Sequence, residues 1–449
     1  MENRTNKPKD GDRTRRTFIK STSAAAGGLI LAPTIISMDG KANKEKYKLA
    51  LTGGAKSVTA SHDDVTTWPR FGAEEEKEVL EILRNPPGYQ RIDIFEESWK
   101  SYFDLPYCKA HYNGTSAILA MFFALDLPAG SEILVPSCTF WATITTMRFV
   151  NLVPILVDID PVTLNFDVED ARRKLTKNTK AVFPVHISGM PADLDRISEF
   201  CDEKGLILLE DACHAHGAKM QGKNIGSWGR MAVYSLQAGK PLPSIEGGMG
   251  NYKNREDFER ATTLGHYHWP KKFGSQSKYS KYNLGLGLKL RMHPMAAALA
   301  KCQLEKLDSF NSLIKRQVRQ INDRITKLPG LHEQQNRSDV DRVYYASNRL
   351  YLNEQEAGIS RDAVVKALKA EGVQANARAA QYLGNDPIFH ESQWWHHMPT
   401  VADKYPGVEE ASRGGIALPL FTKEAPELVE QYIAAFEKVW DNRKDLAKI

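Results

Sequence analysis

Four short apolar runs, separated by helical patterns, set the strongest limit on what this chain can fold into. The runs are Ile133–Val135, Pro154–Val157, Ala181–Val185 and Leu206–Leu209. Each run is continuous rather than alternating, which is typical of strands buried on both faces of a parallel sheet. Helical patterns lie between them, such as Ala192 to Lys204 with Gly205 as its end. The alternation predicts an α/β fold with a mostly parallel, doubly wound sheet.

The pattern changes near Pro294, which divides the expected architecture. Met295 to Leu328 predicts one long helix, and the rest of the chain mixes short strands with helices such as Glu427 to Val439. We expect a large domain over residues 47–290. A smaller α+β C-terminal domain, including the long helix, is expected over residues 291–449. A chain of 449 residues has room for both.

Residues 1–46 are expected to be a targeting signal and a linker. Arg15 and Arg16, followed by Phe18, Lys20 and a weakly apolar stretch rich in Ala and Gly, fit a twin-arginine export signal. The stretch is shorter than the roughly 20 strongly apolar residues of a spanning helix, and no transmembrane helix is expected in the mature chain. The sequence predicts export to the periplasm or another extracytoplasmic space. A disordered basic tail on a cytoplasmic protein is the alternative, and whether the leader is cleaved stays open.

Charge and cysteine content exclude several classes of protein. The formal net charge is +5, and the seven Lys/Arg and three Asp/Glu of residues 1–20 account for +4 of it. The remainder is close to neutral, which argues against a nucleic-acid footprint. Five scattered cysteines without a CxxC pair predict neither a metal site nor a disulfide framework. Cys138 and Cys213 are expected to be small buried hydrophobic residues.

A lysine and an aspartate carry the strongest chemical signal. Lys240 follows Ser235 by five residues and precedes Glu246-Gly247-Gly248, and Asp211 ends the predicted strand at Leu206–Leu209. A lysine amine can form a Schiff base with the aldehyde of pyridoxal 5′-phosphate (PLP), while a carboxylate keeps the pyridine nitrogen protonated. Lys240 alone is better explained as a solvated loop lysine. Together with Asp211 it predicts a PLP enzyme.

Further candidates for the cofactor site lie at predicted strand ends and turns. Gly114, Thr115 and Ser116 precede a helical pattern, where free backbone N–H groups and hydroxyls favour a phosphate, although simple capping by Ser or Thr is the alternative. Either Phe140 or Trp141 is expected to stack on the pyridine ring, and we prefer Phe140. The Ser235 hydroxyl is expected to bind phosphate. His214, three residues after Asp211, is predicted to hydrogen-bond the ring oxygen or the substrate carboxylate.

In this order, the motifs resemble those of the DegT/StrS family of sugar aminotransferases, which are fold-type I PLP enzymes. The matching segments are Asn113–Ala117, Pro136–Phe140, Val157–Asp160, Glu210–His214, and Tyr234–Lys240 with Glu246–Gly248, and the resemblance runs from about Leu49 to about Trp440. It implies the following roles: a Schiff base at Lys240, a pyridinium contact at Asp211, a stacking ring at Phe140, phosphate contacts at Gly114, Thr115 and Ser235, and a ring-oxygen contact at His214.

The resemblance also implies a quaternary structure and a reaction. The family forms homodimers with a shared active site, and Lys289 occupies the position that reaches the partner's phosphate. The expected reaction moves an amino group from Glu or Gln to a keto-sugar or keto-cyclitol. Leu49–Gly54 resembles the cyclitol-aminating branch, and the loops at 266–282 and 381–397 are expected to shape the pocket. A dehydratase or epimerase of the same family and a non-catalytic PLP-binding sensor or scaffold are alternatives. Lys240 argues against the dehydratase branch, in which histidine replaces it.

Overall fold

The computed structural model describes residues 48–447, which lie within one compact unit over residues 45–449. The export signal predicted at residues 1–46 lies outside the described residues and stays a prediction. So does the domain boundary at residues 290 and 291, because the residues on its two sides belong to the same compact unit.

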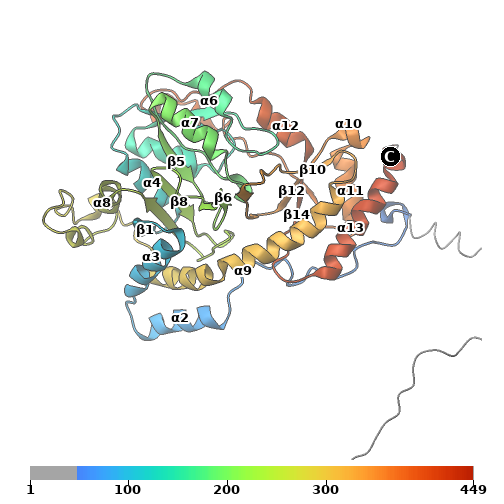
Figure 1. Ribbon diagram of the computed structural model, residues 1–449, viewed down its shortest axis with the longest axis horizontal. Coiled ribbons are helices and arrows are strands. Elements are labelled where there is room, and N and C mark those ends of the chain that lie inside the picture. The colour runs from blue at the N-terminus through green and yellow to red at the C-terminus, as the bar shows by residue number, and fades with distance from the viewer. Residues whose placement is uncertain (1–47, 448–449) are drawn as a thin grey trace, which may run out of the picture. The chain divides into compact units, whose positions relative to one another are not determined.

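A seven-stranded sheet forms the centre of the larger part of the chain (Figure 1). Its strand order is β1-β9-β8-β5-β4-β2-β3. The bounds are β1 (Tyr107–His111), β2 (Glu132–Pro136), β3 (Val153–Val157), β4 (Thr179–Val182), β5 (Ile207–Asp211), β8 (Met231–Ser235) and β9 (Gly248–Tyr252). The pairs β2–β3, β2–β4, β4–β5 and β5–β8 are parallel, whereas β9 is antiparallel to both β8 and β1.

The prediction of a mostly parallel sheet is therefore confirmed, and the four apolar runs form β2, β3, β4 and β5. β4 ends at Val182 instead of continuing to Val185. Pro184 explains the difference, because proline has no N–H group for the ladder. Its carbonyl still accepts a hydrogen bond from the backbone N–H of Asp211 at 3.0 Å.

Helices cover both faces of this sheet. The helices of this part are α2 (Ala73–Arg84), α3 (Gln90–Phe103), α4 (Gly114–Ala124), α5 (Ala142–Thr145), α6 (Val168–Lys174), α7 (Leu194–Lys204) and α8 (Arg255–Thr263). Successive residues of β8 point to opposite faces. Val233 packs in the core cluster of Phe122 on α4, whereas Tyr234 packs against Trp99 on α3. α7 ends at Gly205 in the left-handed conformation, as its sequence predicts.

The long helix α9 (Pro294–Ile325) links the part of the chain around the seven-stranded sheet to the part around a second, four-stranded sheet. It packs against α2 and α3 near its start and against α13 (Pro426–Asp441) near its end (Figure 1). The side chain of His293 caps its first turn by accepting a hydrogen bond from Met295 N. The predicted helix over Met295 to Leu328 is confirmed, with its C-terminal end three residues earlier.

A four-stranded antiparallel sheet with the order β10-β12-β14-β13 follows α9. Its bounds are β10 (Leu331–Glu333), β12 (Asn348–Leu352), β13 (Asn376–Ala377) and β14 (Gly415–Leu418). It shares one core cluster with α11 (Arg361–Ala370) and α13. The short elements elsewhere are β6 (Lys219–Met220), β7 (Lys223–Asn224), β11 (Val340–Asp341), α10 (Glu354–Ala357), α12 (Pro406–Gly414) and α14 (Arg443–Leu446).

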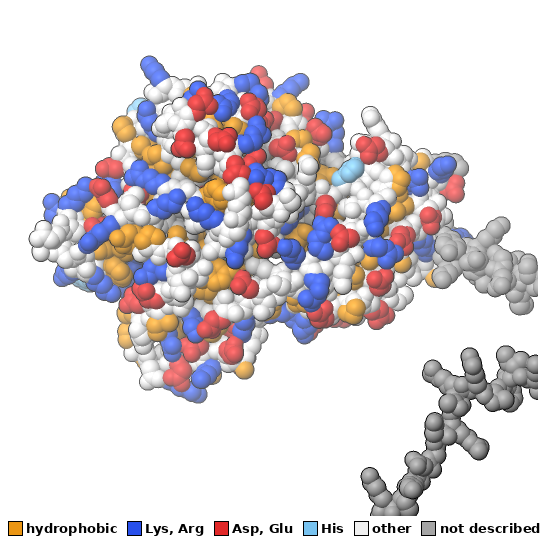
Figure 2. All heavy atoms as spheres, viewed as in Figure 1, with side chains coloured by type: hydrophobic (Ala, Val, Ile, Leu, Met, Phe, Trp, Pro, Cys, Tyr) orange, Lys and Arg blue, Asp and Glu red, His pale blue; other side chains and the backbone are white. Residues whose placement is uncertain are grey.

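The surface in Figure 2 carries basic and acidic side chains interspersed over the face shown. That face therefore has no dominant sign of charge. Across residues 48–447, none of the helices has the length and apolar character required to traverse a bilayer.

Candidate active site

A cavity of about 630 Å³ lies beyond the C-terminal ends of β2, β5 and β8 and at the N-terminus of α4. Ligands of open α/β sheets bind outside the carboxyl ends of the strands, and this volume is typical of a small-molecule site. Most of the residues that the sequence singles out line this cavity together: Gly114, Thr115, Phe140, Asp211, His214, Ser235 and Lys240.

Asp211 ends β5 inside the cavity and is only 3% exposed. Its Oδ2 accepts a hydrogen bond from Thr143 Oγ1 at 2.8 Å, and its Oδ1 accepts one from Cys213 N at 3.1 Å. The Thr143 hydroxyl lies 3.1 Å from that of Thr139, four residues earlier in the chain. Within residues 48–447, no cation forms an ion pair with this carboxylate. A buried carboxylate of this kind is suited to a cationic ligand atom, such as a protonated ring nitrogen.

Lys240 lies on the loop after β8, and that loop is tied down on two sides. Its backbone N–H donates to Gln237 O at 2.8 Å, and its carbonyl accepts from Trp68 Nε1 at 3.0 Å. Its Nζ lies 4.4 Å from the centre of the Tyr345 ring and forms no ion pair with the described residues. An amine that rests on an aromatic face instead of a carboxylate is available for covalent chemistry.

His214 stacks on Tyr345, the same ring that Lys240 Nζ contacts. Its ring lies 4.2 Å from Tyr345, centre to centre, at an interplanar angle of 29°. Burial and then the positive charge of Lys240 lower the pKa of His214 well below its ordinary value, so the ring is neutral near pH 7. Ser188 N lies 3.4 Å from Nδ1 and donates to it, which leaves Nε2–H as the donor. The expected contact with a ring oxygen stays a prediction.

The turn before α4 provides an anion site, with one correction to the sequence analysis. The helix is capped by Asn113, whose Oδ1 accepts hydrogen bonds from Ser116 N at 2.8 Å and Ser116 Oγ at 2.9 Å. The Ser116 hydroxyl is thus engaged with its own cap, and Ser116 does not line the cavity. The N–H groups of Gly114 and Thr115 make no hydrogen bond within the described chain and remain for a ligand.

Gly114 is required by the close approach of β8 to this turn. A Cβ atom at position 114 would lie 2.7 Å from the Cβ of Ser235, nearer than side chains tolerate. The absence of a side chain brings the Ser235 hydroxyl and the helix N-terminus to one end of the cavity. Two backbone donors and two hydroxyl groups there suit a phosphate group.

Phe140 and Trp141 both line the cavity, at 47% and 49% exposure. Their ring centres lie 4.9 Å apart, with the planes inclined at 41°. Neither ring belongs to the core, so both are free to contact a ligand. The preference for Phe140 as the stacking ring stays a prediction.

Lys289 and the loop at 266–282 do not line the cavity of their own chain. Lys289 is exposed, with its Nζ 5.9 Å from the Tyr267 ring. Trp269 of the loop covers the buried Lys109, whose Nζ lies 3.6 Å from the indole centre. Gln381, in the other predicted loop, does line the cavity.

Sequence reasoning missed several other lining residues, among them Thr143, Tyr345, Arg349 and Arg378. Thr143 had a readable signal, because Thr139 and Thr143 are four residues apart after a predicted strand. Arg349 lies on β12 of the smaller sheet, Arg378 just after β13 and Tyr345 just before β12. Their position over the cavity depends on tertiary packing. All five cysteines are buried and free; Cys138 and Cys213, which the sequence predicts to be buried, line the cavity. Burial raises the pKa of the Cys213 thiol well above its ordinary value.

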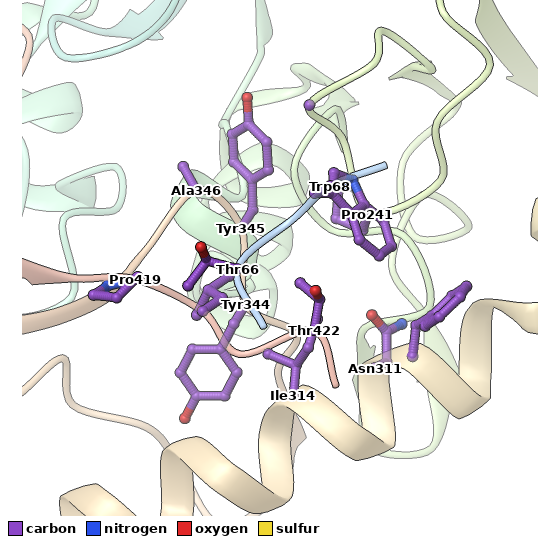
Figure 3. A pocket seen from close by; sticks show the side chains of 13 residues that line it. Thr66, Trp68, Pro241, Asn311, Ile314, Tyr344, Tyr345, Ala346, Pro419 and Thr422 are labelled. Carbon is purple, nitrogen blue, oxygen red and sulfur yellow. The ribbon is translucent and has the colours of Figure 1, made fainter. Parts of the chain in front are cut away.

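A second cavity of about 270 Å³ lies behind the Lys240 loop (Figure 3). Its lining includes five aromatic or proline side chains: Trp68, Pro241, Phe310, Tyr344 and Tyr345. Tyr345 borders both cavities, so it forms part of the wall between them. Trp68 lines this cavity and also donates a hydrogen bond to the Lys240 carbonyl, so the cavity lies next to a contact that holds the lysine loop in place.

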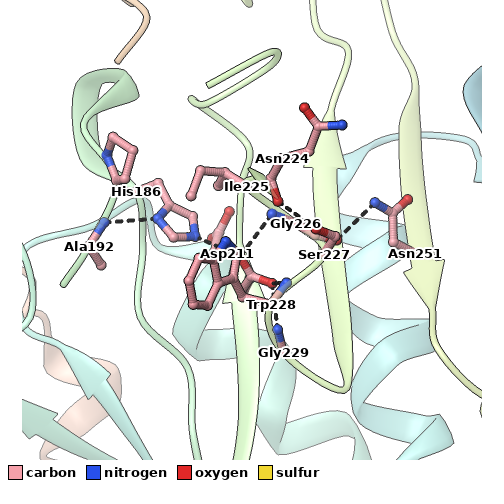
Figure 4. A network of polar contacts seen from close by, with 12 residues as sticks. His186, Ala192, Asp211, Asn224, Ile225, Gly226, Ser227, Trp228, Gly229 and Asn251 are labelled. Atoms are coloured by element: carbon pink, nitrogen blue, oxygen red, sulfur yellow. Dashed lines mark hydrogen bonds and ion pairs between the residues drawn. The ribbon is translucent and has the colours of Figure 1, made fainter. Parts of the chain in front are cut away.

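A buried network supports the strand that carries Asp211 (Figure 4). Glu210 is fully buried, and its carboxylate accepts hydrogen bonds from the backbone N–H groups of Gly226, Trp228 and Gly229 at 2.7 to 2.8 Å. His186 Nε2 lies 3.3 Å from Glu210 Oε2, and His186 Nδ1 accepts from a backbone N–H. Burial alone would raise the pKa of Glu210, but His186 and the backbone donors outweigh it and hold the pKa below its ordinary value.

Comparisons with known proteins identify the family of the chain. The chain belongs to the DegT/DnrJ/EryC1/StrS aminotransferase family, whose profile matches residues 69–437. It is 28% identical to GDP-perosamine synthase of Escherichia coli O157:H7 over 75% of this chain and 87% of that protein. It is 29% identical to a putative L-glutamine:3-amino-2,3-dideoxy-scyllo-inosose aminotransferase of Streptoalloteichus tenebrarius over 80% of this chain and 86% of that protein.

Solved structures share the fold. The chain superposes on the aminotransferase from Psychrobacter cryohalolentis with a TM-score of 0.76 and 24% identity, over 85% of this chain and all of the other. The fold is that of fold-type I PLP enzymes, as the sequence predicts. The cavity fits this cofactor: an unpaired lysine amine, a buried carboxylate without a cation, and a turn with free N–H groups line one space. The protein is thus a PLP-dependent aminotransferase.

Proposed function

We propose that this aminotransferase moves an amino group from glutamate or glutamine to a keto-sugar or keto-cyclitol. The observation that carries the proposal is the meeting of Lys240 and Asp211 in one cavity, next to the free N–H groups of Gly114 and Thr115. Bound PLP would supply an electron sink for the carbon that gains or loses the amino group.

The residues of the chain have distinct roles in this proposal. Gly114, Thr115 and Ser235 hold the phosphate, and Asp211, oriented by Thr143, holds the ring nitrogen in its protonated form. Lys240 Nζ, once free, takes the proton from the α-carbon of the amino donor as a general base, and then gives a proton back as a general acid. Neutral His214 donates a hydrogen bond from Nε2 to the ring oxygen or the substrate carboxylate, and it adds no positive charge to the site.

The nature of the donor and acceptor has weaker support. The named reaction of one relative uses L-glutamine and an amino-inosose, and another relative is named for perosamine. Leu49–Gly54 resembles the cyclitol-aminating branch. The cavity of about 630 Å³ has room for a cofactor and a sugar-sized ring. These observations favour glutamine or glutamate as donor and a cyclic ketone with several hydroxyl groups as acceptor.

A half-reaction experiment tests the proposal. The holoenzyme is mixed with L-glutamate, L-glutamine and other amino acids, one at a time, and the visible absorbance of the cofactor is followed. We expect the band to be lost with glutamate or glutamine and to return when a keto-cyclitol or keto-sugar is added. Lys240→Ala should bind the cofactor and show neither change. A band that no amino donor alters would indicate a sensor or scaffold, and loss of water from the sugar without amination would indicate a dehydratase.

The proposal also includes a homodimer that works outside the cytoplasm. Lys289 is exposed and outside the cavity of its own chain, which suits a residue lent to a partner's phosphate. The Arg15-Arg16 leader suits export of a folded, cofactor-loaded protein. Sedimentation should give a dimer. Lys289→Ala should weaken cofactor binding but leave the dimer intact. Cell fractionation should place the protein outside the cytosol, and an Arg15→Lys, Arg16→Lys double variant should retain it inside.

A further inference from the structure

Two aromatic rings that contact Lys240 also line the second cavity, the space of about 270 Å³ behind the lysine loop (Figure 3). Trp68 donates from Nε1 to the Lys240 carbonyl at 3.0 Å, and the centre of the Tyr345 ring lies 4.4 Å from Lys240 Nζ. The first contact holds the backbone of the lysine, and the second lies at the end of its side chain. A molecule in the second cavity would therefore touch both supports of Lys240 from outside the active-site cavity.

The second cavity has an uncharged and mostly apolar lining. Among the residues of 48–447 that line it, none has a charged side chain, although Asp, Glu, Lys and Arg make up 26% of the chain. Trp68 and Phe310 meet edge to face, with ring centres 5.2 Å apart at 84°. Both rings and Leu420 are half-buried, so they retain apolar surface for a ligand. An ion is excluded, because nothing in the lining would offset the loss of its hydration.

One end of the lining offers a hydrogen-bond acceptor. Asn311 donates from Nδ2 to His216 O at 2.9 Å, which fixes the amide and leaves Oδ1 as an acceptor. Within residues 48–447, no donor hydrogen-bonds to Asn311 Oδ1. Figure 3 shows the Asn311 and Ile314 side chains extending from α9 toward the cavity. A single acceptor in apolar surroundings suits a ligand with a single O–H or N–H donor.

The size of the cavity limits a ligand to one ring with small substituents. An apolar cavity of about 150 Å³ holds benzene, so about 270 Å³ holds a benzene ring that carries a methyl and a hydroxyl group. Such a ring can pack against Trp68, Phe310 and Tyr345, because aromatic pairs are stable at centre distances of about 4.5–7 Å. A sugar or an amino acid suits the lining poorly, since most of its polar groups would find no partner.

The wall between the two cavities connects this space to the active site. Tyr345 and Ala346 border both cavities. Ala346 has a φ of 66°, in the left-handed region that alanine rarely adopts, and such strained positions gather where ligands bind. His214 stacks on the Tyr345 ring that also contacts Lys240 Nζ. The position of this one ring thus affects two residues of the active site.

We propose that the second cavity binds a small neutral aromatic molecule with one hydrogen-bond donor, a phenol, and that its occupation strengthens the support of Lys240. The ring packs against Trp68 and Tyr345, and its O–H donates to Asn311 Oδ1. It thereby holds Trp68 at the Lys240 carbonyl and Tyr345 beside Nζ, which reduces the motion of the lysine loop. This binding step goes beyond the proposed aminotransferase function and does not depend on it.

The test measures binding of 4-methylphenol, toluene and benzoate to the holoenzyme by calorimetry, with and without L-glutamine. Toluene lacks the O–H donor, and benzoate carries a charge. Asn311→Leu keeps the side-chain volume but removes the acceptor, and Ile314→Trp places an indole in the cavity. Leu83→Trp is the control, because Leu83 on α2 is 59% exposed and lines neither cavity. The glutamine half-reaction is then followed at saturating 4-methylphenol.

We expect 4-methylphenol to bind wild type with a Kd of about 0.1–1 mM, as is typical of a ligand of this size, and benzoate not to bind. Toluene should bind about 3- to 10-fold more weakly, because it lacks one hydrogen bond. Asn311→Leu should bind both equally, with the toluene affinity of wild type. Ile314→Trp should bind both at least about tenfold more weakly. Bound 4-methylphenol should speed the half-reaction about fivefold in wild type and Leu83→Trp, and not in Ile314→Trp.

Several results would overturn the inference. Wild type that does not bind 4-methylphenol, or binding that survives Ile314→Trp, would exclude the site, and displacement by glutamine would place the phenol in the active-site cavity instead. An unchanged half-reaction rate would exclude the link to Lys240. If Ile314→Trp does not fold, Asn311→Leu decides, because toluene reports whether its cavity is intact. If wild type reacted with no amino donor, the proposed function would fail, yet the calorimetry would still decide whether the cavity binds a phenol.

Discussion

Replacing Glu210 by glutamine should destabilise the protein far more than a surface substitution of the same kind. Three backbone N–H groups donate to the carboxylate, Trp228 N and Gly229 N to Oε1 and Gly226 N to Oε2, and His186 Nε2 lies 3.3 Å from Oε2. A glutamine side chain replaces one oxygen by an NH₂ group. Whichever oxygen is replaced, two donors then face another donor in a site that water does not reach.

The magnitude follows from these contacts. A hydrogen bond to a charged group contributes about 1.5–3 kcal/mol, so two lost bonds give about 3–6 kcal/mol. That is a large fraction of the stability of a typical domain, about 5–15 kcal/mol. The assay is urea unfolding of the holoenzyme, followed by tryptophan fluorescence. Glu203→Gln is the control, because Glu203 is exposed, and it should leave the midpoint unchanged.

The effect should also depend on pH in a defined direction. The folded-state pKa of Glu210 lies below its ordinary value, so the carboxylate stabilises the fold fully above the pKa of an unfolded glutamate, about 4.3. That contribution is lost as the pH falls through the lower, folded-state pKa. The gap between wild type and Glu210→Gln should therefore narrow in acid. A gap below about 1 kcal/mol near neutral pH, or one that widens in acid, would refute the reasoning.

Two substitutions near the cavity should affect the cofactor and the lysine separately. Thr143→Val removes the 2.8 Å hydrogen bond to Asp211 and should weaken PLP binding about tenfold in an equilibrium titration. Thr145→Val, at a half-buried position whose hydroxyl bonds only Trp141 O, should not, and equal affinities for the two variants would contradict this role. Trp68→Phe keeps an aromatic ring but loses the donor to the Lys240 carbonyl, so kcat should fall about 2- to 10-fold with the cofactor retained. An unchanged kcat would show that the loop does not depend on this bond.

Most of the central sheet was predictable because its strands are buried on both faces. Burial of both faces requires continuous apolar runs, and the runs in the sequence form the strands β2, β3, β4 and β5. β4 ends before the apolar run does because Pro184 has no N–H group to donate, and pairing with β5 resumes only as an isolated bridge between Val185 and Asp211. The helix α9 was also predictable, since no proline or glycine interrupts Met295 to Ile325.

The site was predictable where it is built from strand ends and less so elsewhere. Asp211, Ser235 and Lys240 lie at or just after strands whose positions the sequence indicates. The sequence favours Ser116 as a phosphate contact, because it places the Ser116 hydroxyl at the start of a helix. Asn113 is an equally strong cap residue, and its side chain binds that hydroxyl instead.

Arg349, Arg378 and Tyr345 are site residues that local sequence patterns cannot identify. Arg349 lies on a strand of the smaller sheet, more than a hundred residues after Lys240, and nothing in its neighbourhood distinguishes it from a surface arginine. Its role depends on how that sheet packs over the cavity. A buried, unpaired guanidinium is visible only after the chain has been folded.

Borohydride reduction of the purified holoenzyme, followed by peptide mapping, tests the central assignment most directly. Reduction should attach the cofactor irreversibly to the peptide that contains Lys240, remove the visible band and abolish activity, and Lys240→Ala should give no attached cofactor. Attachment at a different lysine, or a wild-type protein that stays colourless and unmodified after incubation with PLP, would contradict the account.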